Sequence, residues 1–230
     1  LFVKELDRAL MDGRSQLSVH SLKDMPMEVP EELPLLAFSK REDPRDVLVL
    51  PEGKTEIDPE KPLGCSSLRR TLQLKEIYPD LEVKSIRGNL QTRLRKLDAG
   101  EYSALILAAA GLKRLGLEHR INRYFSPEEM IPAAGQGILA VESRVEDAEM
   151  AEILAAIHSE KAECLLMAER AFLKTIGGSC NAPAAALCRE ENGEFSMRAM
   201  YVKDGIHSRK TYMTVNIEDA IAEKDADSKP

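Results

Sequence analysis

The sequence contains no tryptophan, few aromatic residues (4%) and only four cysteines among 230 residues. None of its apolar runs approaches the roughly 20 residues that a membrane helix requires, and the longest, near residues 104–112, is about half that length. Cys65, Cys164, Cys180 and Cys188 are too sparse for a disulfide scaffold, and none forms a C-x-x-C pair. The sequence therefore predicts a soluble protein of a reducing, cytoplasmic compartment.

Charge is unevenly distributed along the chain. The net charge is −7, and 43% hydrophobic with 31% charged residues is ordinary globular composition. Residues 61–124 nevertheless contain 13 Lys and Arg against 6 Asp and Glu, a local excess of +7. This segment is expected to bind anions. Nucleic acid is disfavoured because the segment offers only Tyr78, Tyr102 and Tyr124 for base stacking.

The first residues already have helical periodicity. An apolar stripe over residues 2–10 predicts a helix that ends at Gly13. There is no initiator methionine, capping residue or signal-like segment ahead of it, so we expect the chain to begin inside a longer protein. A short strand at 17–21 and an extended segment at 33–38 follow, since prolines 26, 30 and 34 exclude a helix there.

Strands and helices then alternate from residue 47 to residue 109, which predicts a parallel sheet. We interpret the charged stretch 40–46, with little to bury, and the glycine-containing run 132–137 as two hinges between lobes. A helical region at 146–174, broken near His158, and antiparallel strands at 194–202 and 207–215 predict a separate α+β domain with a frayed tail. The expected fold is a two-lobed α/β body with a third domain, divided as 1–40 with 135–157, 41–134 (anion-binding) and 158–230.

Two strand-to-helix junctions carry the same chemistry. At such junctions the helix N-terminus offers unpaired N–H groups to an anion. Ser66 and Ser67 can cap the first helix, while Arg69 and Arg70 add guanidinium groups that can bind a carboxylate or phosphate at two points. Arg87, Gly88 and Asn89, with Arg93 one turn on, repeat the arrangement and suggest a ligand with several negative charges. The alternative is a pair of capped helices with solvated arginines.

Asp24 and Cys180 are further candidates. Asp24 follows a strand and could face the cleft as acid, base or partner of a cation, but its spacing alone favours an Asx turn before Pro26. Cys180 follows two glycines, which can direct a thiol outward. Cys164 and Cys188 are expected to be buried and inert, and His20 to be packed or hydrogen-bonded rather than a metal ligand.

Seven sequence blocks, in order, resemble the porphobilinogen deaminases, also called hydroxymethylbilane synthases. They are VHSLKDMP (19–26), REDPRD (41–46), SSLRR (66–70), IRGN (86–89) with Arg93, LAAAGLKRLG (107–116), PAAGQG (132–137) and GGSC (177–180). The resemblance runs to about residue 202. It implies two lobes like type II periplasmic binding proteins and a third domain that bears a cofactor cysteine.

The resemblance also implies a reaction. Four porphobilinogen molecules would be joined head to tail, with loss of ammonia, to give hydroxymethylbilane for tetrapyrrole and heme biosynthesis. The primer would be a dipyrromethane held by a thioether to Cys180, with no metal. A primer and product this rich in acetate and propionate groups would explain why Arg69, Arg70, Arg87, Arg93 and Arg114 converge on one cleft.

The same resemblance implies roles for individual residues. Asp24 would be catalytic, stabilising the azafulvenium cation that forms when ammonia leaves and helping to move protons. The implied cofactor-binding residues are Cys180, Lys23, Asp24, Ser66, Ser67, Arg69, Arg70, Arg87 and Gly88. The implied substrate-binding residues are Arg87, Arg93, Arg114 and Gln136.

Three departures from the family pattern matter. The family's first segment, with a strand, a helix and further ligands, is missing ahead of Leu1. Cys65 stands where threonine is common, and we expect the third domain to be short by the apolar helix that usually closes it. We therefore expect the chain as it stands to be poorly stable and inactive.

Two other functions are compatible with parts of the sequence. A non-catalytic two-lobed protein that binds small anions would use the same fold, but it needs neither Cys180 nor a third domain. An RNA-binding protein would use residues 61–124 and show steep salt dependence. The favoured interpretation is a cytoplasmic monomer that acts on porphobilinogen and has no nucleic-acid or membrane partner.

Overall fold

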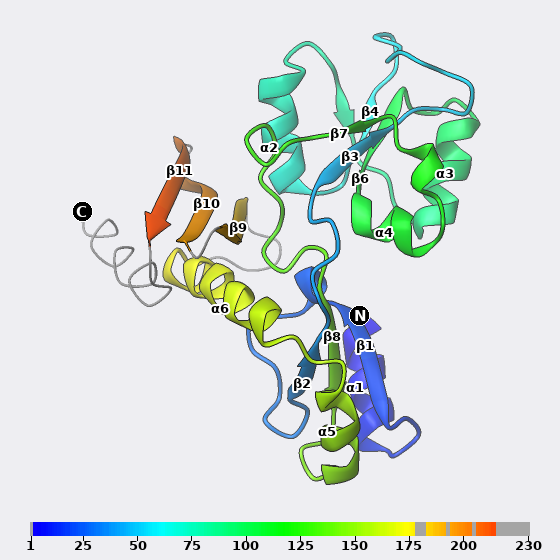
Figure 1. The fold of residues 1–230 in the computed structure, drawn as a ribbon. Coiled ribbons are helices and arrows are strands. Elements are labelled where there is room, and N and C mark those ends of the chain that lie inside the picture. Colours follow the sequence, from blue (N-terminus) through cyan, green and yellow to red (C-terminus); the bar gives the residue numbers. More distant parts are fainter. Residues whose placement is uncertain (1, 178–182, 192–193, 204–205, 215–230) are drawn as a thin grey trace.

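The computed structural model describes residues 2–177, 183–191, 194–203 and 206–214, and these residues form three β-sheets (Figure 1). We call the sheet β1-β8-β2 with its helices lobe 1, the five-stranded sheet with its helices lobe 2, and the sheet β11-β10-β9 with α6 the C-terminal body. The domain boundaries given above remain predictions.

Lobe 1 is built around an antiparallel sheet. Its central strand β8 (Leu139–Ser143) pairs with β1 (Leu17–Ser21) on one side and with β2 (Leu35–Phe38) on the other. Helix α1 (Phe2–Met11) ends before Gly13, whose φ of +69° is the left-handed conformation expected after a helix. Helix α5 (Ala148–Ala155) packs on β2 and β8. The predicted opening helix and both strands are confirmed.

Lobe 2 contains a mixed sheet in the order β5-β4-β6-β3-β7. Its strands are β3 (Asp46–Val49), β4 (Leu63–Gly64), β5 (Val83–Lys84), β6 (Ala104–Ala108) and β7 (Arg123–Tyr124). The predicted parallel pairing is confirmed for β5, β4 and β6, but it is wrong for β3, which is antiparallel to β6 and β7. The reason is that residues 50–62 link β3 to β4 without the crossover helix that a parallel connection needs.

Two helices of lobe 2 begin directly after a residue whose side chain caps the helix N-terminus. Ser67 caps α2 (Leu68–Ile77), and Asn89 caps α3 (Leu90–Asp98). Helix α4 (Ala109–Arg114) follows β6 directly and is followed by the short 3-10 helix η2 (Glu118–Arg120).

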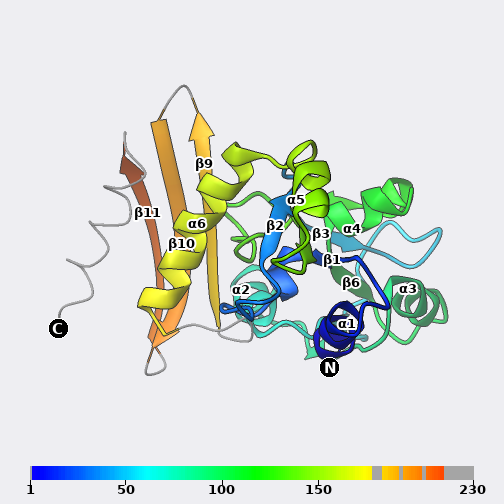
Figure 2. The ribbon, with the colours of Figure 1, turned by 90° about the horizontal axis from the view of Figure 1, so that it is seen from below.

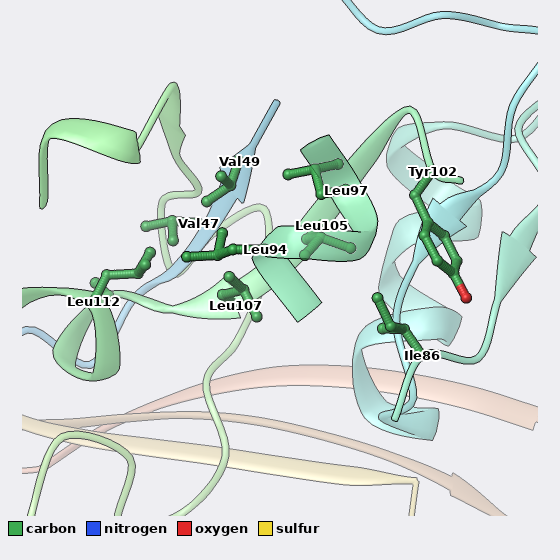
Figure 3. Packing of buried hydrophobic residues seen from close by; sticks show 10 residues of the cluster. Val47, Val49, Ile86, Leu94, Leu97, Tyr102, Leu105, Leu107 and Leu112 are labelled. Carbon is green, nitrogen blue, oxygen red and sulfur yellow. The ribbon is translucent and has the colours of Figure 1, made fainter. Parts of the chain in front are cut away.

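Apolar side chains of these elements form a continuous core. Figure 3 shows Leu94 and Leu97 of α3 against Val47 of β3 and Leu105 and Leu107 of β6. All five side chains are buried, and each such residue stabilises the fold by roughly 1.5–3 kcal/mol relative to an exposed one. This cluster packs α3 against the sheet, and a second cluster, which contains Leu63 of β4 and Leu74 of α2, packs α2 against it.

The chain crosses between the lobes twice, at residues 39–45 and 125–138 (Figure 1). The crossings are joined by hydrogen bonds from Ser39 N to Leu139 O (2.9 Å) and from Glu42 N to Gly137 O (3.0 Å). A Cβ atom on Gly137 would lie 2.3 Å from Glu42 O, and its φ is +91°. Only glycine fits at this close approach, which explains the glycine-containing run at the second crossing.

The C-terminal body consists of α6 (Glu160–Thr175) packed across an antiparallel sheet (Figure 2). Its strands are β9 (Ala184–Glu191), β10 (Glu194–Lys203) and β11 (Ile206–Thr214). The predicted break before α6 is confirmed, with Ser159 as the N-cap. The predicted turn at 204–205 and the tail lie outside the described residues.

Strand β9 was not predicted. Ala184, Ala186 and Cys188 pack toward α6, whereas Ala185 and Leu187 pack toward Ile131 on the other side. Because both faces are buried, the strand lacks the alternation of polar and apolar residues that marks a half-exposed strand. No helix among the described residues is long and apolar enough to cross a membrane.

Candidate functional site

A pocket of about 510 Å³ is lined by residues of both lobes, of the second crossing and of the C-terminal body. Its lining residues are Lys23, Asp24, Ser66, Ser67, Leu68, Arg69, Arg70, Arg93, Ala133, Gln136 and Ala184. Eight of the twelve residues predicted as site residues are therefore brought together. Four cationic side chains face one place, which suits a ligand with several carboxylates.

The β4–α2 junction is organised by two serines with different tasks. Ser67 Oγ accepts a hydrogen bond from Arg70 N at 3.5 Å and caps α2. The prediction that Ser66 also caps this helix is wrong. Ser66 Oγ instead donates to Ile86 O (2.5 Å) and accepts from Ile86 N (2.9 Å), which ties this junction to the following one. The neighbouring Cys65 is buried, and its thiol lies 3.7 Å from Ser67 O.

Arg69 and Arg70 are buried and are paired with Asp46 at the start of β3. Arg69 Nη1 donates to Asp46 Oδ2 at 2.7 Å, and Arg70 donates to Asp46 Oδ1 from Nη2 (2.7 Å) and Nε (3.0 Å). Burial alone would raise the pKa of Asp46, but the charges of Arg69 and Arg70 hold that pKa well below its usual value. The carboxylate is therefore ionised throughout the physiological range.

Asp46 was missed by the sequence analysis, which treated residues 40–46 as charged and with little to bury. In the structure this side chain is completely buried. The available signal was its position directly before an apolar strand, because an acidic residue there needs a cationic partner to be buried.

Lys23 lies at the junction of lobe 1 and the pocket, on the turn η1 (Leu22–Asp24). Its Nζ donates to Gln136 Oε1 at 3.3 Å. Burial and the charge of Arg70 lower the pKa of Lys23 to about 8, while Asp24 and Asp46 oppose that change. Lys23 is thus a cation whose charge is easily lost at moderately alkaline pH.

Asp24 is exposed and lines the pocket. Across the part of the chain that the structure describes, no hydrogen bond joins its carboxylate to a neighbouring backbone N–H, so an Asx turn does not account for it. The bond that closes this turn runs from Met25 N to Leu22 O instead (3.0 Å). The carboxylate therefore remains available to a ligand.

The second predicted junction enters the pocket only in part. Arg93 lines it and donates from Nε to Gly88 O at 2.8 Å, which fixes the guanidinium against the loop. Arg87 and Gly88 are exposed and do not line this pocket, so the convergence expected for all five arginines is not found.

Arg114 lies apart from the main pocket. It ends α4 and lines a separate cavity of about 60 Å³, which shares Lys23 and Gln136 with the main pocket. A role for Arg87, Gly88 and Arg114 in binding therefore stays a prediction, and any such role concerns the rim or the adjoining cavity.

The cysteines have different environments. Cys188 is buried as expected, and burial together with the charge of Glu169 raises the pKa of its thiol to about 12. The expectation that Cys164 is buried is wrong, because this residue lies on the solvent side of α6 while Leu165 and Ala168 face the sheet. Cys180 lies outside the described residues. His20 is buried and hydrogen-bonded to Ser18 and Glu142, as expected.

Comparisons with known proteins agree with this site. The family model described as porphobilinogen deaminase, dipyromethane cofactor binding domain, matches residues 1–152, and the porphobilinogen deaminase C-terminal domain matches residues 162–226. A periplasmic domain of BvgS from Bordetella pertussis matches 73% of the chain and 33% of its own, at 15% identity and a TM-score of 0.40, which is too low to bear on function.

Curated relatives are much more similar. The porphobilinogen deaminase of Acetivibrio thermocellus is 55% identical over 88% of this chain and 68% of the relative, and that of Ruminiclostridium josui is 51% identical over 89% and 68%. The porphobilinogen deaminase of Alkaliphilus oremlandii is 50% identical over 91% of this chain and 71% of the relative. With a pocket of cationic side chains beside an available carboxylate, these similarities lead to one conclusion: the chain belongs to the porphobilinogen deaminase family.

Proposed function

We propose that this protein joins four porphobilinogen molecules head to tail, with loss of ammonia, on a dipyrromethane primer attached to Cys180, and so makes hydroxymethylbilane. The observation that carries the proposal is the pocket in which Asp24 meets Lys23, Arg69, Arg70 and Arg93. Its volume of about 510 Å³ lies within the roughly 300–1,000 Å³ of small-molecule sites.

The residues present fit a primer attached to Cys180. Ala184 lines the pocket and follows Cys180 by four residues. Four residues of extended chain span at most about 14 Å, so a primer on Cys180 would be within reach of the pocket. A thioether at this residue would therefore place the primer among the cationic side chains.

The cationic side chains would bind the acetate and propionate groups. Arg69 and Arg70 are held in place by Asp46, and Arg93 by Gly88 O. Guanidinium groups match carboxylates in a two-point geometry, and their fixed orientation limits the entropy lost on binding. Lys23 would supply a further charge from lobe 1.

Asp24 would act on the reacting ring. Positive charge develops on a pyrrole as ammonia leaves, and the primer supplies the nucleophilic ring carbon that receives the new unit. An exposed carboxylate in a pocket that is otherwise cationic stabilises that charge and can accept or return a ring proton. Removing its charge should therefore affect turnover far more than folding.

The two crossings would allow the lobes to move. Both join lobe 1 to lobe 2 without regular secondary structure, and they are tied together at Gly137 and Glu42. The proposed domains are 1–40 with 135–157, 41–134 and 158–230, so the crossings lie at the domain boundaries. A growing product needs more room at each step, which hinge motion at these segments would provide.

The cysteines that the structure describes fit the cytoplasmic location that we propose for this monomer. Cys65, Cys164 and Cys188 are free thiols, as is usual in a reducing compartment. Gel filtration with light scattering would test the monomer.

The function is tested by following porphobilinogen consumption and ammonia release by the full-length protein. We expect about one ammonia for each porphobilinogen consumed and a linear tetrapyrrole as product. The variant Cys180→Ser should not assemble an active enzyme. Saturable binding of porphobilinogen without ammonia release would instead identify a small-anion binding protein and contradict the proposal.

A further inference from the structure

The carboxylate of Asp46 is the centre of a hydrogen-bond network beneath the pocket. It is completely buried, yet it accepts four hydrogen bonds, three from Arg69 and Arg70 and one from Gln136 Nε2 at 2.8 Å. Oδ1 accepts three of these bonds and Oδ2 accepts one. Asp46 is completely buried and does not line the pocket, so its carboxylate does not contact a ligand there.

The network determines which N–H groups of Arg69 and Arg70 are already hydrogen-bonded and which remain for a ligand. Arg69 also donates to Ile131 O at 2.7 Å, and Arg70 to Ile106 O at 3.2 Å. Each guanidinium has five N–H donors, so among the described residues Arg69 retains three and Arg70 two. Both arginines line the pocket. Without Asp46, nothing comparable would hold the two like-charged groups side by side.

Gln136 extends the network to the other lobe. Its Nε2 donates to Pro44 O (2.6 Å) and to Asp46 Oδ1, so both of its amide hydrogens are used. Its Oε1 accepts from Lys23 Nζ. Gln136 was predicted to bind substrate, but it has no donor left for a carboxylate. It connects Lys23 of lobe 1 to Asp46 of lobe 2 through the second crossing.

We propose that Asp46 is a positioning residue, which orients Arg69 and Arg70 toward the pocket and, through Gln136, holds Lys23 of the other lobe against the same array. This inference rests on the proposed function, because the array matters only if the pocket binds carboxylates. Asp46 acts through the residues that it holds, and Gln136 shares this role.

The network also determines how Lys23 responds to pH. The charged groups around Lys23 are Asp24 on the same turn, Asp46 on β3, and Arg69 and Arg70 on α2. Removing the Asp46 charge leaves two arginines facing Lys23 with only Asp24 to compensate. Since this disfavours the ammonium form, Lys23 should lose its proton at a lower pH.

The test compares the wild-type holoenzyme with Asp46→Asn, which keeps the size of the side chain and removes its charge. We expect kcat/KM for porphobilinogen to fall about tenfold or more, mainly through KM, because the carboxylate-binding groups are misplaced. We also expect the alkaline limb of the pH profile to move to lower pH by about half a unit or more. A purely structural defect would not move that limb.

Asp98→Asn is a matched control. Asp98 is also an aspartate of lobe 2 paired with an arginine, since its Oδ1 accepts from Arg120 Nη2 at 2.7 Å, but it does not line the pocket. It should keep the wild-type KM and alkaline limb. Wild-type values of both in Asp46→Asn would overturn the proposal.

A second variant carries the test if Asp46→Asn does not fold. Gln136→Met removes the link to Lys23 but leaves Asp46 paired with both arginines, and it should raise KM and lower the alkaline limb in the same sense. An unchanged KM and limb in that variant would refute the network. If the wild-type protein lacks any primer adduct by intact mass, the proposed function itself fails and this inference fails with it.

Discussion

Arg41 of the first crossing and Glu169 of α6 form a buried two-point ion pair, with Nη1 to Oε1 at 2.7 Å and Nη2 to Oε2 at 3.0 Å. The same carboxylate accepts hydrogen bonds from Gly135 N (2.7 Å) and Cys188 N (2.8 Å). One side chain of the C-terminal body, Glu169, is therefore bonded to both crossings and to β9.

Removing one partner of this pair should be strongly destabilising. Glu169→Ala leaves Arg41 and two backbone N–H groups buried without an acceptor, which is expected to cost about 3–5 kcal/mol. We expect a lower midpoint in urea unfolding followed by circular dichroism. Arg14→Ala serves as the control, because the Arg14–Asp12 pair is exposed and should leave the midpoint unchanged. Equal midpoints for Glu169→Ala and wild type would contradict this assignment.

The close approach of the two crossings predicts an effect at Gly137. Gly137→Ala would place Cβ against Glu42 O and force alanine into the left-handed region, at an expected cost of about 1–3 kcal/mol. Thermal unfolding should show a lower midpoint. Gly111→Ala is the matched control, because that helical glycine has free space around it and no positive φ. A Gly137→Ala protein as stable as the Gly111→Ala protein would show that the crossings are not so tightly joined.

The exposed carboxylate of Asp24 predicts a separation of activity from stability. Asp24→Asn keeps the shape of the side chain but removes the charge and the proton-accepting site, so turnover should fall about 10²- to 10⁴-fold. Unfolding should be unaffected, since the side chain is exposed. Porphobilinogen consumption and thermal unfolding measured on one preparation check both parts. Near-normal turnover would remove Asp24 from the proposed mechanism.

The lowered pKa of Lys23 predicts a pH effect. If its charge binds carboxylates, kcat/KM should fall as the pH rises through about 8, the pKa of Lys23. Lys23→Arg should move this fall in kcat/KM to higher pH, because arginine keeps its charge. The effect on stability has the opposite sign: the pKa in the folded state is below that of the unfolded chain, so this residue's contribution rises with pH above about 8. If kcat/KM fell at the same pH in Lys23→Arg as in the wild type, Lys23 would not be the group whose deprotonation causes the fall.

Helix ends were predictable where the sequence has a capping residue or a glycine. Ser67 and Asn89 were expected to begin helices, and Gly13 to end one, which the structure confirms. Each such residue acts on the few residues beside it, so no tertiary information is needed.

Features that depend on distant partners could not be predicted. The direction of β3 depends on the path of the loop that follows it, and β9 lacks alternation because neighbours cover both of its faces. Asp46 looks like a surface charge until the fold brings Arg69, 23 residues further along the chain, to its carboxylate. The same holds for Gln136, because its hydrogen bonds to Lys23 and Asp46 depend on the fold that brings the two lobes together.

The most direct test of the central claim is mass spectrometry of the intact protein and of its peptides. The account predicts an added mass of two condensed pyrrole units on the peptide that contains Cys180. That adduct should persist in Cys164→Ser, which removes an exposed thiol of α6, and should be lost in Cys180→Ser. An adduct on Cys164, or a fully active protein without any adduct, would contradict the account.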